Sequence, residues 1–107
     1  MANDRVFSAL ADPTRRQVFD RLRHGPKPVS VLAKGLPVTR SAVSQHLRVL
    51  KDAGLVADQA DGARRIYRID PKGLAAVRVW FDGFWDDALV SFKAAAERTA
   101  RKEKSKW

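Results

Sequence analysis

The stretch that decides the fold is VTRSAVSQHLRVLKDAGLV, residues 38–56. Three apolar residues in it are spaced by four and then three positions, which predicts one buried face of a helix: Val43, Leu47 and Leu50. The other face carries arginines and short hydrogen-bonding side chains instead of the usual mixture of Glu and Lys. Thr39 is a suitable N-cap and Gly54 a suitable terminator, so we expect the helix to lie between them.

The segments before this helix predict a helix-turn-helix. Asp12 and Pro13 form a strong helix start, an N-cap aspartate with proline at the first helical position, and His-Gly-Pro at residues 24–26 ends that helix. A shorter helix precedes it. Residues 29–34 form another short helix, ended by Gly35. Two helices joined by a short turn that contains glycine are typical of a helix-turn-helix.

The pattern changes after residue 54. Residues 55–60 and 64–69 alternate as strands do, and the Asp-Gly pair at 61–62 between them is a strong hairpin signal. A hairpin directly after a helix-turn-helix makes a winged helix. We therefore expect a mainly α fold with a small β-hairpin, in the order α-α-α-α-β-β-α, as one domain over residues 1–107.

Asp70 and Pro71 repeat the aspartate-proline start and open a long last helix over residues 71–100, followed by a basic, frayed tail at 101–107. Its apolar stripe is too wide for a small domain to cover, which predicts a homodimer through this helix. The competing interpretation is that this helix closes the domain's own core. The predicted interface residues on this helix are Leu74, Val77, Trp80, Phe81, Phe84, Trp85, Leu89 and Phe92.

Charge, cysteine content and the absence of certain motifs exclude several classes of protein. The 107 residues carry a formal charge of +9, which favours a polyanionic partner such as nucleic acid. No cysteine is present, which excludes disulfides, thiolate metal sites and cysteine nucleophiles. No apolar run approaches the roughly 20 residues of a membrane span, and no signal peptide is recognisable, so we expect a cytoplasmic protein without a membrane partner. Neither a Gly-rich phosphate loop nor a paired-carboxylate cleft appears, so we expect no enzyme.

Three motifs in this order and spacing resemble the ArsR/SmtB-type winged-helix repressors. They are ALADPTRR at residues 9–16, SQHLRVLKDAGLV at 44–56 and GARRIYRID at 62–70. The resemblance covers nearly the whole chain. It implies a homodimeric bacterial repressor of transcription that binds a near-palindromic operator in double-stranded DNA and releases it when an effector binds. It also implies that the helix beginning near Thr39 reads the major groove. It further implies that the first and last helices build the dimer, which adds Val6 of the first helix to the predicted interface.

The chain departs from the metal-sensing members of that family. Those members carry cysteines on the helix equivalent to residues 29–34, or histidine and carboxylate ligands on the last helix, whereas this last helix has no histidine. We therefore expect a member of the branch without metal-site cysteines, with no metal and no cofactor. The sequence does not identify an effector. His46 is expected to be structural. Asp82 and Asp86 could gather a hard cation across a two-fold axis, but solvation or pairing with basic residues is the preferred interpretation.

Base edges in the major groove are read by hydrogen-bonding side chains. On the helix after Thr39, we expect Ser44 and Gln45 to contact bases, whereas the other contacts go to bases or phosphates. The predicted DNA-contacting residues of this helix are Thr39, Arg40, Ser41, Ser44, Gln45 and Arg48.

The wing should add Arg64 and Arg65, which fit a phosphate or the adjacent minor groove. Arg15 and Arg16 either contact the DNA backbone or form ion pairs within the chain, such as Arg16 with Asp12 or Asp20. The alternative function is a winged-helix module that binds protein or RNA without recognising an operator. RNA modules stack bases on exposed aromatic side chains, and the aromatics here are mostly on the last helix.

Overall fold

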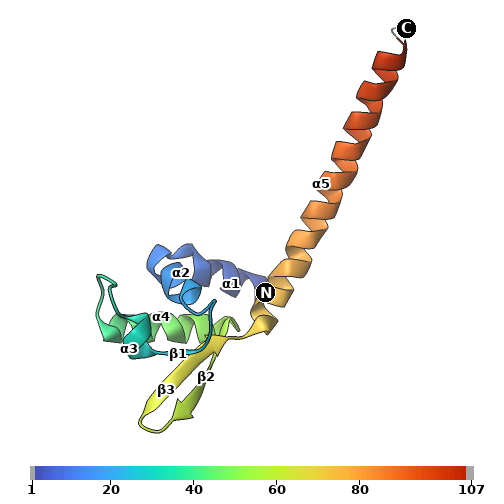
Figure 1. Cartoon of the computed structure of the whole chain (residues 1–107). Coiled ribbons are helices and arrows are strands. Elements are labelled where there is room, and N and C mark those ends of the chain that lie inside the picture. The colour runs from blue at the N-terminus through green and yellow to red at the C-terminus, as the bar shows by residue number, and fades with distance from the viewer. Residues whose placement is uncertain (1, 106–107) are drawn as a thin grey trace. The chain divides into compact units, whose positions relative to one another are not determined.

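The computed structural model describes the backbone of residues 2–105 and the side chains of residues 3–102 (Figure 1). The elements are α1 (Ala2–Ala11), α2 (Pro13–Asp20), β1 (Lys27–Pro28), α3 (Val29–Leu32), α4 (Arg40–Asp52), β2 (Val56–Asp61), β3 (Arg64–Ile69) and α5 (Pro71–Ser105). The chain divides into two compact units. The residues up to Val77 form a winged-helix unit, and the second unit, from Arg78, continues α5.

Side-chain caps set the predicted helix starts. The Asp12 carboxylate accepts a hydrogen bond from the backbone N–H of Arg15 at 3.0 Å, and the Thr39 hydroxyl accepts one from the backbone N–H of Ala42 at 3.0 Å. Gly54 has φ +78°, the left-handed conformation that ends α4. These three predictions are confirmed.

Helix α2 ends earlier than predicted, at Asp20 and not at residues 24–26. The backbone N–H groups of Leu22 and Arg23 bond three residues back, to the carbonyl oxygens of Phe19 and Asp20, so the chain tightens into turns there. The Arg21 guanidinium donates to the carbonyl oxygens of Leu32, at 3.0 Å, and Lys34. This side chain therefore joins the end of α2 to α3.

The core lies in the winged-helix unit, between its helices and the base of the wing. Val43, Leu47 and Leu50 of α4 are 0% exposed, as the spacing predicted. They pack with buried residues of the other elements: Val6, Ala9, Val18, Leu22, Leu32, Leu55 and Val56. The prediction for Val6 is wrong, because its side chain is 1% exposed and belongs to this core, which leaves it no surface for a partner chain.

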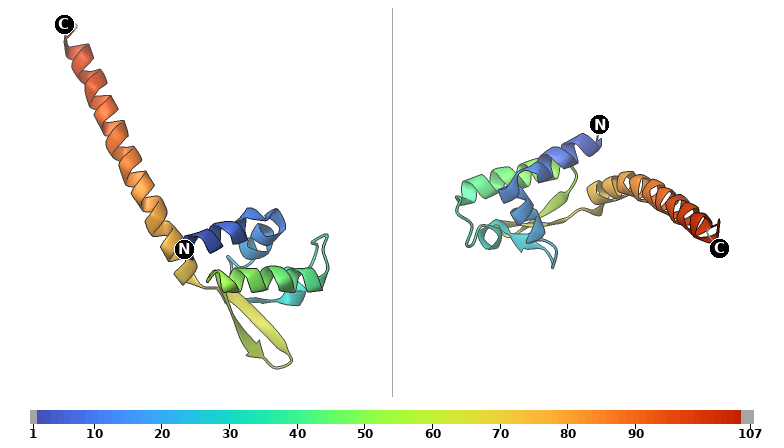
Figure 2. Two further views of the ribbon diagram at one scale, coloured as in Figure 1. Left: turned by 180° about the vertical axis from the view of Figure 1, so that it is seen from behind. Right: turned by 90° about the horizontal axis from the view of Figure 1, so that it is seen from above.

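The wing is part of a three-stranded antiparallel sheet with strand order β1-β3-β2. In the β2–β3 hairpin Asp61 pairs with Arg64 across a turn in which Gly62 has φ +62°, as the Asp-Gly signal predicted. Strand β1 was not predicted. It pairs Lys27 with Tyr67. The hairpin extends away from α1 and α2, and α4 lies between them and the hairpin (Figures 1 and 2).

Helix α5 begins where predicted, and the Asp70 carboxylate accepts a hydrogen bond from the backbone N–H of Lys72 at 3.0 Å. It continues to Ser105 and so passes the predicted end at residue 100. The last part of the predicted tail, residues 106–107, lies outside the described residues. None of the helices in the described part of the chain combines the length and apolar character that a membrane span needs.

Candidate nucleic-acid interface

Helix α4 presents its polar face outward. The six side chains predicted to contact DNA are all exposed: Thr39, Arg40, Ser41, Ser44, Gln45 and Arg48. Because the opposite face is buried in the core, packing fixes the rotation of this helix about its axis and keeps the polar face at the surface. The structure therefore brings these predicted residues together on one helix.

A hollow of about 340 Å³ lies between α4 and the wing. Arg40, Ser41 and Ser44 of α4 line one side, and Arg64 and Arg65 of β3 line the other. Ser30 of α3 also lines the hollow, although it was not predicted as a DNA-contacting residue. The hydroxyl and guanidinium groups of these five residues of α4 and β3 could not be brought together from the sequence alone, because no spacing rule relates α4 to β3. The hollow thus combines basic and hydroxyl groups with the apolar residues Pro28, Val29 and Ala63.

Arg65 is held by an ion pair within the chain. Its Nε donates to Oδ2 of Asp58 at 2.7 Å, and Nζ of Lys51, in the last turn of α4, donates to Oδ1 at 2.8 Å. The hydrogen bonds from Lys51 and Arg65 hold the pKa of Asp58 below its ordinary value. The same carboxylate raises the pKa of Arg65. Neither Asp58 nor Lys51 was singled out in the sequence.

Arg64 is held more loosely. Its Nη2 lies 3.5 Å from Oδ2 of Asp61, and both side chains are more than 60% exposed. An exposed pair of this kind contributes little to stability, because solvent screens it and two mobile side chains must be ordered. Arg64 can therefore exchange this partner for another anion at low cost.

The two arginines of α2 have different surroundings. Nη1 of Arg15 donates to the carbonyl oxygen of Ala9 at 3.1 Å and to that of Ser8 at 3.5 Å, which caps the end of α1. Arg16 is exposed. Its suggested ion-pair partner Asp12 instead caps α2, and the backbone N–H of Arg15 is the main reason that the pKa of Asp12 is lowered.

Within one chain, Asp82, Asp86 and the other candidate metal ligands do not form a cluster. Among the described residues, no group of three or more His, Cys, Asp or Glu side chains is placed to hold a metal ion. Asp82 lies 3.8 Å from Nε of Arg78 on its own helix. The ring of His46 is half-buried, and its Nδ1 is buried without a hydrogen-bond partner in the described part of the chain.

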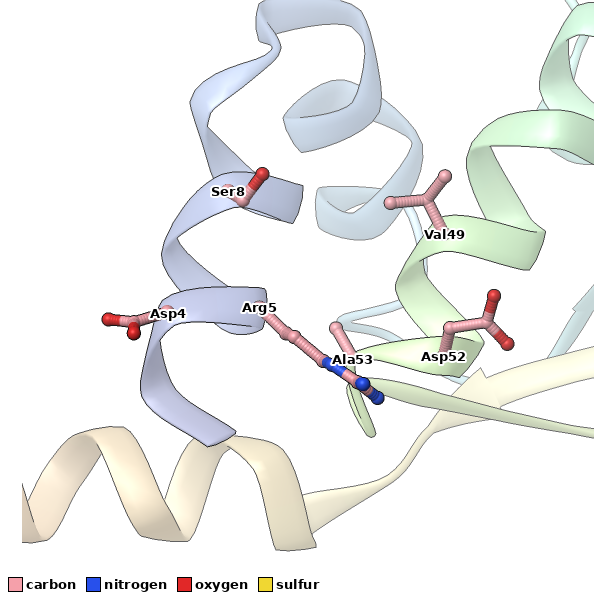
Figure 3. Close-up of a pocket in the computed structure, with 6 residues that line it drawn as sticks. All are labelled: Asp4, Arg5, Ser8, Val49, Asp52 and Ala53. Carbon is pink, nitrogen blue, oxygen red and sulfur yellow. The ribbon is translucent and has the colours of Figure 1, made fainter. Parts of the chain in front are cut away.

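A second hollow, of about 550 Å³, lies between α1 and α4 and is lined by Asp4, Arg5, Ser8, Val49, Asp52 and Ala53. The Arg5 side chain extends from α1 across the opening toward α4 (Figure 3). Because its walls carry charges of both signs, this hollow does not share the basic character of the one between α4 and the wing.

The part of α5 beyond the winged-helix unit exposes a broad apolar surface. Phe84, Trp85 and Phe92 are 59%, 66% and 73% exposed. Trp80 packs edge-on against Phe81 and Phe84, with ring centroids 5.0 Å and 4.6 Å apart. Val79 and Val90 are exposed too, and the predicted interface omitted them because they lie off its main stripe.

The predicted interface residues nearer the start of α5 differ from these. Leu74 is 37% exposed, whereas Val77 is partly buried against the core of the winged-helix unit. The competing interpretation, that the last helix closes the domain's own core, therefore holds for Val77.

Comparisons with known proteins agree on the class of protein. A family model described as a helix-turn-helix domain matches residues 10–59. The HTH-type transcriptional regulator Rv2034 of Mycobacterium tuberculosis is 56% identical over 89 residues, which cover 83% of this chain and 83% of that protein.

Two solved structures are similar over most of their length. The ArsR-like transcriptional regulator from Rhodococcus sp. RHA1 is 33% identical, with a TM-score of 0.67 over 89% of this chain and 92% of that chain. The homodimeric winged helix-turn-helix DNA-binding domain Mb0332 from Mycobacterium bovis, a possible ArsR-family transcriptional regulator, is 31% identical. Its TM-score is 0.64, over 82% of each chain.

The predicted fold class, family and class of function are therefore confirmed, and the family is one of regulators and not of enzymes. With its helix-turn-helix, its wing and these relatives, the chain belongs to the ArsR/SmtB-type family of winged helix-turn-helix transcriptional regulators.

Proposed function

We propose that this protein binds double-stranded DNA as a homodimer, through α4 and the wing of each chain, and represses transcription from the site that it occupies. The observation that carries this proposal is the hollow between α4 and the wing, where Arg40, Ser41 and Ser44 face Arg64 and Arg65. A basic concavity beside an exposed polar helix face suits the phosphate backbone next to a major groove.

The contacts divide by chemistry. Ser44 and Gln45 are proposed to read bases, because a hydroxyl and an amide can each match donor and acceptor pairs on base edges. Arg40, Ser41 and Arg48 take bases or phosphates. Thr39 also lies at the start of α4, where the free N–H groups and the helix dipole favour an anion.

The wing and α2 are proposed to add sequence-independent affinity. Arg64 and Arg65 reach a phosphate or the neighbouring minor groove, and Arg16 reaches the backbone from α2. Arg15 is a weaker candidate, because it caps α1.

Dimerisation is proposed through α5, together with the first helix. The exposed aromatic surface of Phe84, Trp85 and Phe92 supports this, because monomeric proteins rarely expose contiguous apolar surface of this extent. Leu74, Trp80, Phe81 and Leu89 are exposed on the same helix and belong to the proposed interface. A symmetric dimer would place two α4 helices in successive major grooves, about 34 Å apart.

Repression follows from occupancy, because a dimer seated across two half-sites excludes other proteins from the same DNA. A signal that releases the DNA would act most directly on the dimer helix, at residues 81–92, since that segment would set the spacing of the two reading helices.

Mapping the DNA that the protein protects from cleavage tests this proposal. The expected result is a pseudo-palindromic site with two protected half-sites about 10 base pairs apart, centre to centre. Tight binding to single-stranded RNA with no protection of duplex DNA would contradict the proposal and favour the alternative of an RNA-binding winged helix.

A further inference from the structure

Asp58 connects two parts of the proposed DNA-binding surface. It lies on β2, and its two carboxylate oxygens bind different elements: Oδ1 accepts from Lys51 of α4 at 2.8 Å, and Oδ2 accepts from Arg65 of β3 at 2.7 Å. In the sheet register Arg65 faces Ala60, so Asp58 is its diagonal neighbour on the same face of the hairpin. One carboxylate therefore ties the wing to the helix that carries the polar face.

The burial of this group makes the connection stiff. The Asp58 side chain is only 8% exposed, whereas those of Lys51 and Arg65 are 53% and 56% exposed. A carboxylate removed from water needs its hydrogen-bonding partners, and loss of either one leaves an under-compensated charge. The side chains of Lys51 and Arg65 are thus each held by the Asp58 carboxylate, although about half of their surface remains exposed.

The atoms used by Arg65 decide what remains for a ligand. A guanidinium has five N–H donors, and the contact with Asp58 uses the one on Nε. The four donors on the two Nη atoms are not needed for that contact. Arg65 also lines the hollow with Arg40 and Ser41, so its Nη donors are available for the two oxygens of a phosphate bound there.

We infer that Asp58 is a positioning residue for DNA binding, which holds Arg65 in the orientation that receives a phosphate. This inference rests on the proposed function. Asp58 is then an acidic residue on a surface proposed to bind a polyanion. The direction in which DNA affinity changes when Asp58 is replaced therefore tests its role.

A purely electrostatic role and a positioning role of Asp58 predict opposite effects on DNA affinity when its carboxylate is removed. If Asp58 acted only through its negative charge, its removal would strengthen DNA binding, because a carboxylate repels phosphates. If it positions Arg65, removal must weaken binding despite that gain. Asp61→Asn is the matched control, since it removes one negative charge from the same hairpin, where Asp61 is exposed and pairs only loosely with Arg64.

The experiment measures the affinity of each variant for the protected duplex at one fixed salt concentration. We expect Asp58→Asn to bind about threefold to tenfold more weakly than Asp61→Asn, which should equal or exceed the wild type. Equal affinity of the two variants would overturn the inference.

A double-mutant cycle with Arg65 separates positioning from a general loss of structure. Asp58→Asn should cost little further affinity in an Arg65→Ala background, because the residue that it positions is already absent. A loss of the same size in both backgrounds would overturn the inference. If Asp58→Asn fails to fold by circular dichroism, Arg65→Lys replaces it, because lysine keeps the charge but lacks Nε. Arg65→Lys should then also bind more weakly, and wild-type affinity would overturn the inference.

The proposed function and the role of Asp58 would be contradicted by different results. A wild-type protein that does not bind duplex DNA at low salt overturns the proposed function together with this inference. Wild-type binding with no penalty in Asp58→Asn overturns the role of Asp58 alone.

Discussion

The backbone N–H of Gly73 donates a hydrogen bond to the carbonyl oxygen of Gly54 at 3.0 Å. Gly73 lies in the first turn of α5, and Gly54 ends α4, so the contact fixes the start of one helix against the end of the other. A Cβ atom on Gly73 would lie 2.6 Å from that carbonyl oxygen and 2.9 Å from its carbon. Glycine is required at residue 73 because the two backbones approach this closely.

Gly73→Ala should therefore destabilise the winged-helix unit by about 1–3 kcal/mol, the usual cost of forcing an extra methyl group into a packed site. The free energy of unfolding in urea measures this. Gly83→Ala is the matched control in the same helix, because a Cβ there meets nothing within 4 Å. Its better helix propensity should instead add up to about 1 kcal/mol of helix stability. Wild-type stability of Gly73→Ala would show that the backbone contact is looser than described.

A phosphate is one of the two contacts proposed for Arg64, and its loss should not depend on the DNA sequence. Arg64→Ala should weaken binding about equally for all duplex sequences and lower the slope of log affinity against log salt by about 1. Titrations at several salt concentrations measure this slope. Lys93→Ala, on the exposed surface of α5, is the control and should leave the slope unchanged. A change of sequence preference in Arg64→Ala would instead assign Arg64 to base reading.

The Asp58 ion pairs should make stability depend on acid pH. The pKa of Asp58 is lower in the folded protein than in the unfolded chain, because Lys51 and Arg65 bond its charged form. Its contribution is therefore fully present above the unfolded pKa and is lost as the pH falls through the folded pKa, below about 4.

At neutral pH we expect Asp58→Asn to cost about 1–3 kcal/mol, as for other hydrogen bonds to charged groups. The difference from the wild type should shrink as the pH falls below about 4. Unfolding curves at several pH values, with Asp61→Asn as the exposed control, measure it. A difference that stays constant down to pH 3 would be evidence against a charged carboxylate in these pairs.

The dimer proposed through α5 depends on exposed aromatic side chains. Phe84→Glu should give a monomer at micromolar concentration, because a carboxylate would be buried in an apolar interface. Light scattering should then give the chain mass of 12.0 kDa, against twice that value for the wild type. Lys93→Glu is the control for an added carboxylate on the same helix. A monomeric wild type would exclude this mode of assembly.

Local rules in the sequence were sufficient for most of the fold. The caps at Asp12 and Thr39, the terminator at Gly54 and the spacing of Val43, Leu47 and Leu50 each depend on neighbours within a few residues. The structure has each of them as predicted. Strand β1 was missed because two residues carry no alternation, and its pairing with Tyr67 joins parts of the chain 40 residues apart.

The contacts of the candidate site were harder to predict for the same reason. The exposure of the six polar residues on α4 followed from helical periodicity. In contrast, the engagement of Arg65 by Asp58, and of Asp58 by Lys51, depends on the strand register and on where α4 ends. Val6 lay on an apolar stripe like those of interface residues, and only the packed core shows that it is buried within its own chain.

The central claim is that the exposed polar face of α4 reads DNA sequence. Its most direct test is the affinity of Gln45→Ala and Arg48→Ala for the protected duplex and for copies of it with single base pairs changed. Val49→Ala, on another side of the same helix, is the matched control. The account predicts that each of the two variants binds its site about 5-fold to 100-fold more weakly and that Gln45→Ala also discriminates less at one base position, whereas Val49→Ala keeps both properties. Unchanged affinity and unchanged base preference in both variants would contradict it.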